Sequence, residues 1–166
     1  GLRHLQGCEA LETLQLDGCP IGDTGIAYLK PLNRLVSLSL IDTKITNKAA
    51  VSLAELRQLE ELFLLGTKID DSGVARLAAC EKLRVLNLAD TEVSDACLQK
   101  LRTMTRLGVL DLRRTGLTDA GLRQLRHFPA LKEVHLDGTK VTAKGVAALR
   151  DALKSTDIHY HAASFF

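Results

Sequence analysis

Hydrophobic residues recur along this chain with a period of 24 residues. Each 24-residue unit opens on a leucine, at Leu11, Leu35, Leu59, Leu83, Leu107 and Leu131. When positions are counted from this leucine, positions 4 and 6 are also apolar, and position 19 is leucine in all six copies. A fixed period of this length indicates a stack of similar structural units that share one continuous core.

Each unit contains two hydrophobic periods. Positions 4 and 6 alternate with polar neighbours, as in a strand that buries one face. Positions 16, 19 and 22 have helical spacing. Position 13 is acidic or amide in the first five units, and we predict that it is the helix N-cap: the residues are Asp23, Asn47, Asp71, Asp95 and Asp119. Short loops must connect these elements, so successive strands should lie parallel and adjacent, with the helices outside.

One unit shows the complete motif. Residues 107–122 have the sequence Leu-Gly-Val-Leu-Asp-Leu-Arg-Arg-Thr-Gly-Leu-Thr-Asp-Ala-Gly-Leu. This pattern resembles leucine-rich repeat proteins, both bacterial members and the cysteine-containing type found beside F-box segments. The resemblance implies an α/β fold, a right-handed solenoid with parallel strands on its concave face and short helices on its convex face, used for recognition. The repeats show no F-box segment before them, so a ubiquitin-ligase role does not carry over.

The repeat boundaries predict the domain organisation. We expect one domain over residues 1–166, with a half-unit at 1–10, six full units at 11–154 and a terminal half-unit at 155–166. The chain opens inside a unit and without Met, so we expect a fragment of a longer protein. No apolar run has the length of a membrane span, and no signal peptide is visible.

Catalytic motifs are absent from the sequence, so we expect neither an enzyme nor a small-molecule substrate nor a cofactor. The four cysteines fall at positions that should face inward: Cys8, Cys19, Cys80 and Cys97. No Cys-x-x-Cys pair occurs among them, so we expect buried free thiols. Unpaired thiols and the lack of a signal peptide favour the cytoplasm, although the compartment stays open.

Histidines gather near the C-terminal end. Parity places four polar residues on the exposed face of two neighbouring strands: His135, Asp137, His159 and His161. Strands lie about 4.8 Å apart, so His135 and His159 should be neighbours. Three imidazoles and a carboxylate could hold a transition metal. The alternative, which we expect, is a solvated polar end of a binding face without metal.

The concave face is the predicted binding surface. Positions 3, 5 and 7 should point out of the strand layer, and in the middle units several of them are apolar within a charged rim. An apolar centre inside a polar rim is typical of a protein interface. The expected partner is therefore a protein or peptide, with Phe63 as anchor. The predicted contact residues are Ile41, Phe63, Leu65, Val85, Asn87, Ala89, Val109, Asp111 and Arg113.

Charge is sorted between the two faces. Positions 14–24 hold 15 Lys and Arg against four Asp and Glu, whereas positions 1–13 hold seven against 16. The basic convex helices are an alternative surface for nucleic acid or an anionic surface. Aromatic residues are only 4% of the chain and do not interleave with these basic residues. We therefore expect a protein partner rather than nucleic acid.

Overall fold

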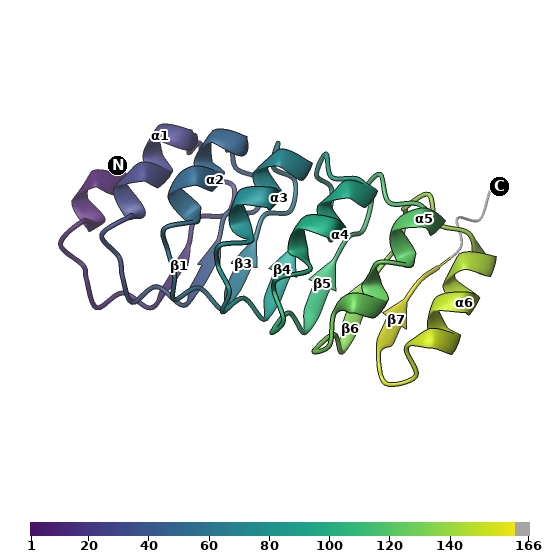
Figure 1. Ribbon diagram of the computed structural model, residues 1–166. Helices are drawn as coiled ribbons and strands as arrows, with labels where there is room; N and C mark the ends of the chain where they lie inside the picture. Colours follow the sequence, from purple (N-terminus) through teal and green to yellow (C-terminus); the bar gives the residue numbers. More distant parts are fainter. Residues whose placement is uncertain (162–166) are drawn as a thin grey trace.

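The strands form one parallel sheet whose spatial order follows the chain, β1-β2-β3-β4-β5-β6-β7. The computed structural model describes residues 1–161, so residues 162–166 of the predicted terminal half-unit lie outside the described residues. Seven short strands succeed one another along the solenoid (Figure 1). They are β1 (Thr13–Gln15), β2 (Ser37–Ser39), β3 (Glu61–Phe63), β4 (Val85–Asn87), β5 (Val109–Asp111), β6 (Glu133–His135) and β7 (Asp157–His159).

The strand register equals the sequence period. Each strand residue lies opposite the residue 24 positions later, so Leu62 pairs with Leu86 and Leu86 with Leu110. Position 4 therefore forms a column of inward aliphatic residues, and positions 3, 5 and 7 form columns on the outward side. We call that outward side the strand face. The predicted α/β solenoid, with parallel strands on one side and short helices on the other, is confirmed.

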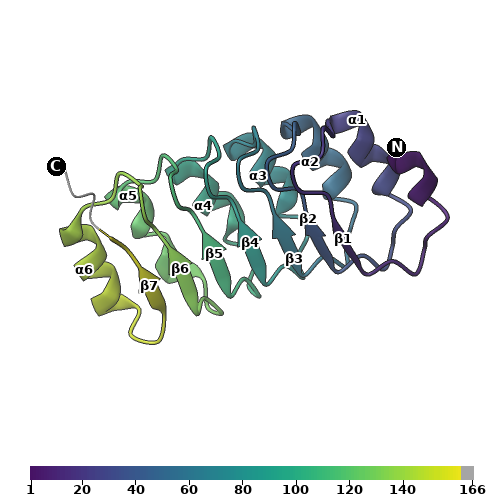
Figure 2. The ribbon, with the colours of Figure 1, turned by 180° about the vertical axis from the view of Figure 1, so that it is seen from behind.

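Helices cover the opposite side of the sheet (Figure 2). The α-helices are α1 (Asp23–Ile26), α2 (Asn47–Leu53), α3 (Asp71–Leu77), α4 (Asp95–Leu101), α5 (Asp119–Leu122) and α6 (Ala143–Ala152). Three 3-10 helices complete this layer: η1 (Leu2–Leu5), η2 (Ala27–Leu29) and η3 (Leu125–His127). Among residues 1–161 no helix has the length and apolar character that crossing a membrane requires.

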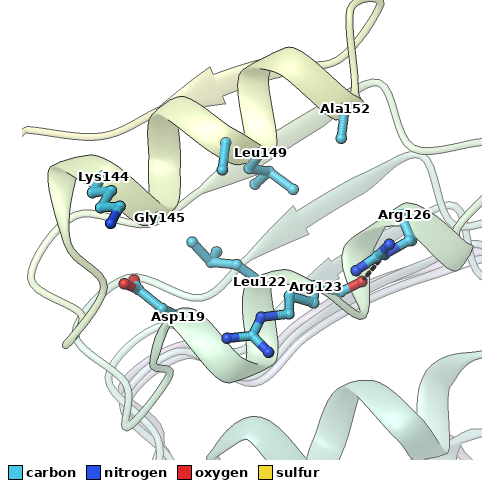
Figure 3. A pocket seen from close by; sticks show the side chains of 9 residues that line it. Asp119, Leu122, Arg123, Arg126, Lys144, Gly145, Leu149 and Ala152 are labelled. Atoms are coloured by element: carbon cyan, nitrogen blue, oxygen red, sulfur yellow. Dashed lines mark hydrogen bonds between the residues drawn. The ribbon is translucent and has the colours of Figure 1, made fainter.

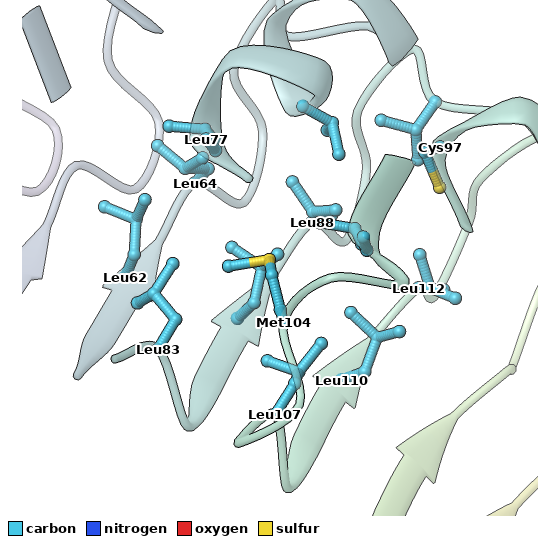
Figure 4. Packing of buried hydrophobic residues seen from close by; sticks show 14 of the residues in the cluster. Leu62, Leu64, Leu77, Leu83, Leu88, Cys97, Met104, Leu107, Leu110 and Leu112 are labelled. Atoms are coloured by element: carbon cyan, nitrogen blue, oxygen red, sulfur yellow. The ribbon is translucent and has the colours of Figure 1, made fainter. Parts of the chain in front are cut away.

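A continuous leucine core fills the space between the strands and the helices. Figure 4 shows Leu62 close to Leu83 of the next unit, and Leu110 close to Leu107 of its own unit, with Met104 of the preceding unit nearby. These side chains are almost completely shielded from solvent. Leucines in the first units, by contrast, are only partly buried, because those units are packed from one side: Leu2, Leu5, Leu11, Leu14 and Leu16.

The helix N-termini differ from the prediction. Position 12, not position 13, is the N-cap, as at Ser94, whose hydroxyl accepts a hydrogen bond from Ala96 N. The position-13 side chain instead reaches into the next unit. Asp95 accepts hydrogen bonds from Thr118 N at 2.7 Å and from Thr118 Oγ1 at 2.6 Å. The same cross-unit pairing starts from Asp23, Asn47, Asp71 and Asp119.

The cysteines are free, as predicted, but they are not uniformly buried. Cys80 and Cys97 are buried, Cys19 is half-buried and Cys8 is exposed. The expectation that all four face inward is therefore wrong for Cys8, which lies in the first half-unit. Burial raises the pKa of Cys80 to about 11, and it also raises the pKa of Cys97.

Truncating a central core leucine should destabilise the solenoid strongly. Leu86 is fully buried in β4, so Leu86→Ala should lower the free energy of unfolding by ~2–5 kcal/mol. Denaturant titration followed by circular dichroism measures this loss. A cost below about 1 kcal/mol would contradict the core assignment, because even a single buried methylene contributes nearly that much.

Thiol labelling should divide the cysteines into two pairs. At mildly alkaline pH, a thiol reagent should label Cys8 and Cys19 rapidly in the folded protein. Cys80 and Cys97 should be protected, because burial hinders access and disfavours their thiolates. Mass spectrometry should then find four labels after unfolding without any reductant. Labels that need prior reduction would show disulfides instead.

Candidate functional site

The nine predicted contact residues all lie on the strand side of the sheet, but they are not equally accessible. Seven of them are half-buried. Ala89 and Asp111 are buried, with 1% and 6% of their surface exposed, so both are less accessible than predicted. The half-buried residues are Ile41, Phe63, Leu65, Val85, Asn87, Val109 and Arg113.

The accessible apolar residues follow a diagonal across the strand face. Ile41 and Leu65 occupy position 7 of neighbouring units, and Phe63 lies two residues before Leu65 on the same side. Val85 and Val109 then pair with each other at position 3 of β4 and β5. We call these five residues the apolar diagonal. It spans four strands, or roughly 15 Å at the usual strand spacing.

An ion pair fixes the charged edge of this diagonal. Arg113 Nη2 donates to Asp111 Oδ2 at 2.6 Å, and Arg113 Nε donates to both carboxylate oxygens. The hydrogen bonds to Asp111 raise the pKa of Arg113. The buried Asp111 therefore holds the guanidinium in place, while Arg113 stays partly open to solvent.

A shallow hollow of about 380 Å³ adjoins the diagonal at the ends of the strands. Leu65 and Ala89 give it an apolar side, and Arg113 and Arg114 give it a basic side. Asp137 and Gly138 complete the lining. The hollow is open, so it suits a side chain of a larger partner better than an enclosed small molecule.

Position 8 adopts a left-handed backbone conformation in every full unit. Glycine occupies this position in three units, whereas Asp42, Asp90 and Arg114 occupy it in the others with φ near +54°. Arg114 Nη2 lies 3.0 Å from Asp90 Oδ2. Sequence reasoning did not select Arg114 and Asp90. The sequence feature that could have identified them is that both occupy position 8, which is glycine in three other units.

The four predicted metal candidates separate into two groups. His161 pairs with Asp137, whose Oδ1 lies 2.9 Å from His161 Nδ1 and accepts from His161 N at 2.6 Å. Burial acts to raise the pKa of Asp137, but the hydrogen bonds from His161 outweigh it and hold the pKa below its ordinary value. His135 and His159 stack on each other, as the register predicted, and they approach Glu133 rather than Asp137.

The convex side carries a groove of about 460 Å³ between α5 and α6 (Figure 3). Arg123, Arg126 and Lys144 contribute basic groups to its lining and Asp119 contributes a carboxylate. Gly145 and apolar residues such as Leu122 and Leu149 line the rest. Arg126 Nε donates to Arg123 O at 2.7 Å, which ties one of these cations to the backbone.

Comparison with family models supports the repeat assignment. A model described as a leucine-rich repeat matches residues 7–30. Together with the seven-stranded parallel sheet, this match supports a leucine-rich repeat fold. Comparison with curated proteins gives no match.

Several solved structures share the fold. An internalin from Listeria monocytogenes superposes with a TM-score of 0.74 and 22% identity, covering 99% of this chain and 52% of its own. Internalin C2 from the same species gives 0.55 and 21%, covering 92% and 82%. A leucine-rich repeat protein from Leptospira interrogans gives 0.65 and 18%, covering 94% and 44%. At these identities the likeness shows the fold, and the chain spans about half the length of the first internalin.

The left-handed conformation at Arg114 generates a prediction. Arg114→Ala and Arg114→Gly both remove the exposed ion pair with Asp90, but only glycine relieves the backbone strain. Arg114→Gly should therefore be about 1 kcal/mol more stable than Arg114→Ala, the reverse of their order in a helix. Thermal melts of the two variants measure the difference. Equal stabilities would show that position 114 is not strained.

Proposed function

We propose that this chain is a non-catalytic recognition module that binds a protein or peptide on its strand face. The leucine-rich repeat fold is generally a protein-interaction module, and its members are typically non-catalytic scaffolds. The observation that carries the choice of face is the apolar diagonal, which occupies outward positions where the repeat pattern does not require apolar residues. The equivalent positions of the first unit are polar: Thr13, Gln15 and Asp17.

The arrangement of the diagonal supports a protein partner. Phe63 lies between Ser39 and Asn87 in the position-5 column, so it is the apolar residue of this column between two polar neighbours. Buried aromatic anchors of this kind dominate interface energies when a partner encloses them. The Asp111–Arg113 pair presents an oriented guanidinium at the edge of the diagonal, which can donate hydrogen bonds to a carboxylate or a backbone carbonyl of the partner.

The breadth of the surface favours an extended segment or loop over a small molecule. Four strands contribute to the diagonal, and the adjoining hollow is open to solvent. A small ligand would need an enclosing pocket to bury most of its surface. A peptide laid across the strands could place one side chain against Phe63 and another in the hollow beside Arg113.

A second candidate uses the convex side. The groove between α5 and α6 combines three cations and the Asp119 carboxylate with an apolar floor, and its net positive charge suits an anionic surface or the backbone of a nucleic acid. Binding there would depend steeply on salt, because it would release counterions, whereas apolar anchoring on the strand face would not. Salt dependence therefore separates the two candidates.

A charge at Phe63 should weaken recognition. Peptides selected from a random display library on the immobilised wild-type chain serve as probes. Phe63→Glu should weaken their binding by about 2 kcal/mol or more, which is about 30-fold in Kd, because the carboxylate would be buried against apolar groups. Fluorescence anisotropy of labelled peptides measures the change.

Two controls accompany this variant. Gln15→Glu introduces the same charge at position 5 of β1, outside the diagonal, and should leave the affinity nearly unchanged. Arg102→Glu combined with Arg126→Glu reverses charge on the helix side and should also have little effect. Loss of binding in this convex double variant, with binding retained in Phe63→Glu, would overturn the proposal in favour of the second candidate.

A further inference from the structure

Four chemically active side chains form a compact square at the C-terminal end of the strand face. Glu133 and His135 belong to β6, and the register places Asp157 and His159 of β7 directly opposite them. Val134 and Ile158, between them in sequence, are buried in the core. The alternation along both strands therefore turns all four polar side chains outward together.

The two imidazoles converge on one carboxylate oxygen. Their rings are stacked, with centroids 4.4 Å apart and planes within 9° of parallel. Glu133 Oε1 lies 2.9 Å from His135 Nε2 and 3.3 Å from His159 Nε2. Asp157 Oδ2 lies 3.4 Å from His159 Nε2 on the other side. Nitrogen atoms from both rings and oxygen from two carboxylates thus surround one small volume.

One of these nitrogen atoms lacks a hydrogen-bond partner. His159 Nε2 is buried, and within residues 1–161 no group meets it with hydrogen-bond geometry. A buried polar nitrogen without a partner is costly unless something satisfies it. The two imidazole side chains can still rotate, because 23% of the His135 side chain and 37% of the His159 side chain are exposed.

Two imidazoles and a carboxylate are a donor set that transition metals prefer. Calcium and magnesium select sites made of oxygen, whereas zinc accepts two histidines with one carboxylate and leaves a further position open. The ligand atoms of Glu133, His135 and His159 all lie within 4.8 Å of one another. Zinc bonds of about 2.0–2.1 Å place tetrahedral ligands ~3.3 Å apart, so modest side-chain rotations would close the site.

We propose that Glu133, His135 and His159 form a binding site for a divalent transition metal, with zinc as the best match and Asp157 as an additional ligand. The metal would satisfy His159 Nε2 and replace the ring-stacking contact with coordination bonds. The open position would face outward from the strand face. This site is separate from the apolar diagonal, so either proposal can fail without the other.

Zinc titration tests the proposal. Isothermal calorimetry at neutral pH should find one zinc ion per wild-type chain, and saturating zinc should raise the melting temperature. His159→Ala and Glu133→Gln should each weaken binding more than tenfold, because even residues that only orient metal ligands contribute about 10–100-fold. In nuclear magnetic resonance spectra, zinc should shift the imidazole signals of His135 and His159 together.

Matched controls identify the site. His127→Ala, on the helix side, and His161→Ala, in the pair with Asp137, should bind zinc like the wild type. Cys8→Ser combined with Cys19→Ser should also retain binding, which excludes the accessible thiols. Circular dichroism confirms that each variant is folded. The proposal is overturned if the wild type does not bind at millimolar zinc, or if binding survives in His159→Ala and Glu133→Gln.

Discussion

The constant length of the repeat is the constraint on which this structure depends. Because every unit has 24 residues, each strand pairs with the next in one register, and equivalent residues form straight columns across the sheet. The leucine columns build the core from contacts between neighbouring units. The outward columns can then vary without disturbing the core, and this freedom allows a surface with its own chemistry.

Much of the fold could be predicted because it follows from periodicity alone. The spacing of Leu86 and Leu88 indicates which side of a strand is buried, and the 24-residue period gives the register. The same register predicts that His135 lies beside His159, and the two residues are paired in the sheet. Parity and period are properties of the backbone, so the identity of the neighbouring side chains does not change them.

The partners of individual polar side chains could not be predicted, because they depend on how far each side chain reaches. Asp95 has a suitable type for an N-cap, yet its carboxylate lies one unit away, on Thr118, because Ser94 already caps its own helix. Parity could not show that Arg113 would cover Asp111, or that Glu133 rather than Asp137 would meet the histidines. Cys8 is exposed for a different reason, since its position in the unit predicts burial only where another unit packs on both sides.

The hydrogen bonds that position-13 side chains accept all run in the same direction along the array. Each acidic or amide side chain accepts from the unit that follows it, as Asp71 does from Ser94 and Asp95 from Thr118. Every junction between full units therefore contains a hydrogen bond from the backbone N–H of position 12 to the position-13 side chain of the preceding unit. Gene duplication or loss of one whole unit would leave all remaining junctions intact. The array can thus change length in evolution by single steps while each step brings a new set of outward residues to the surface.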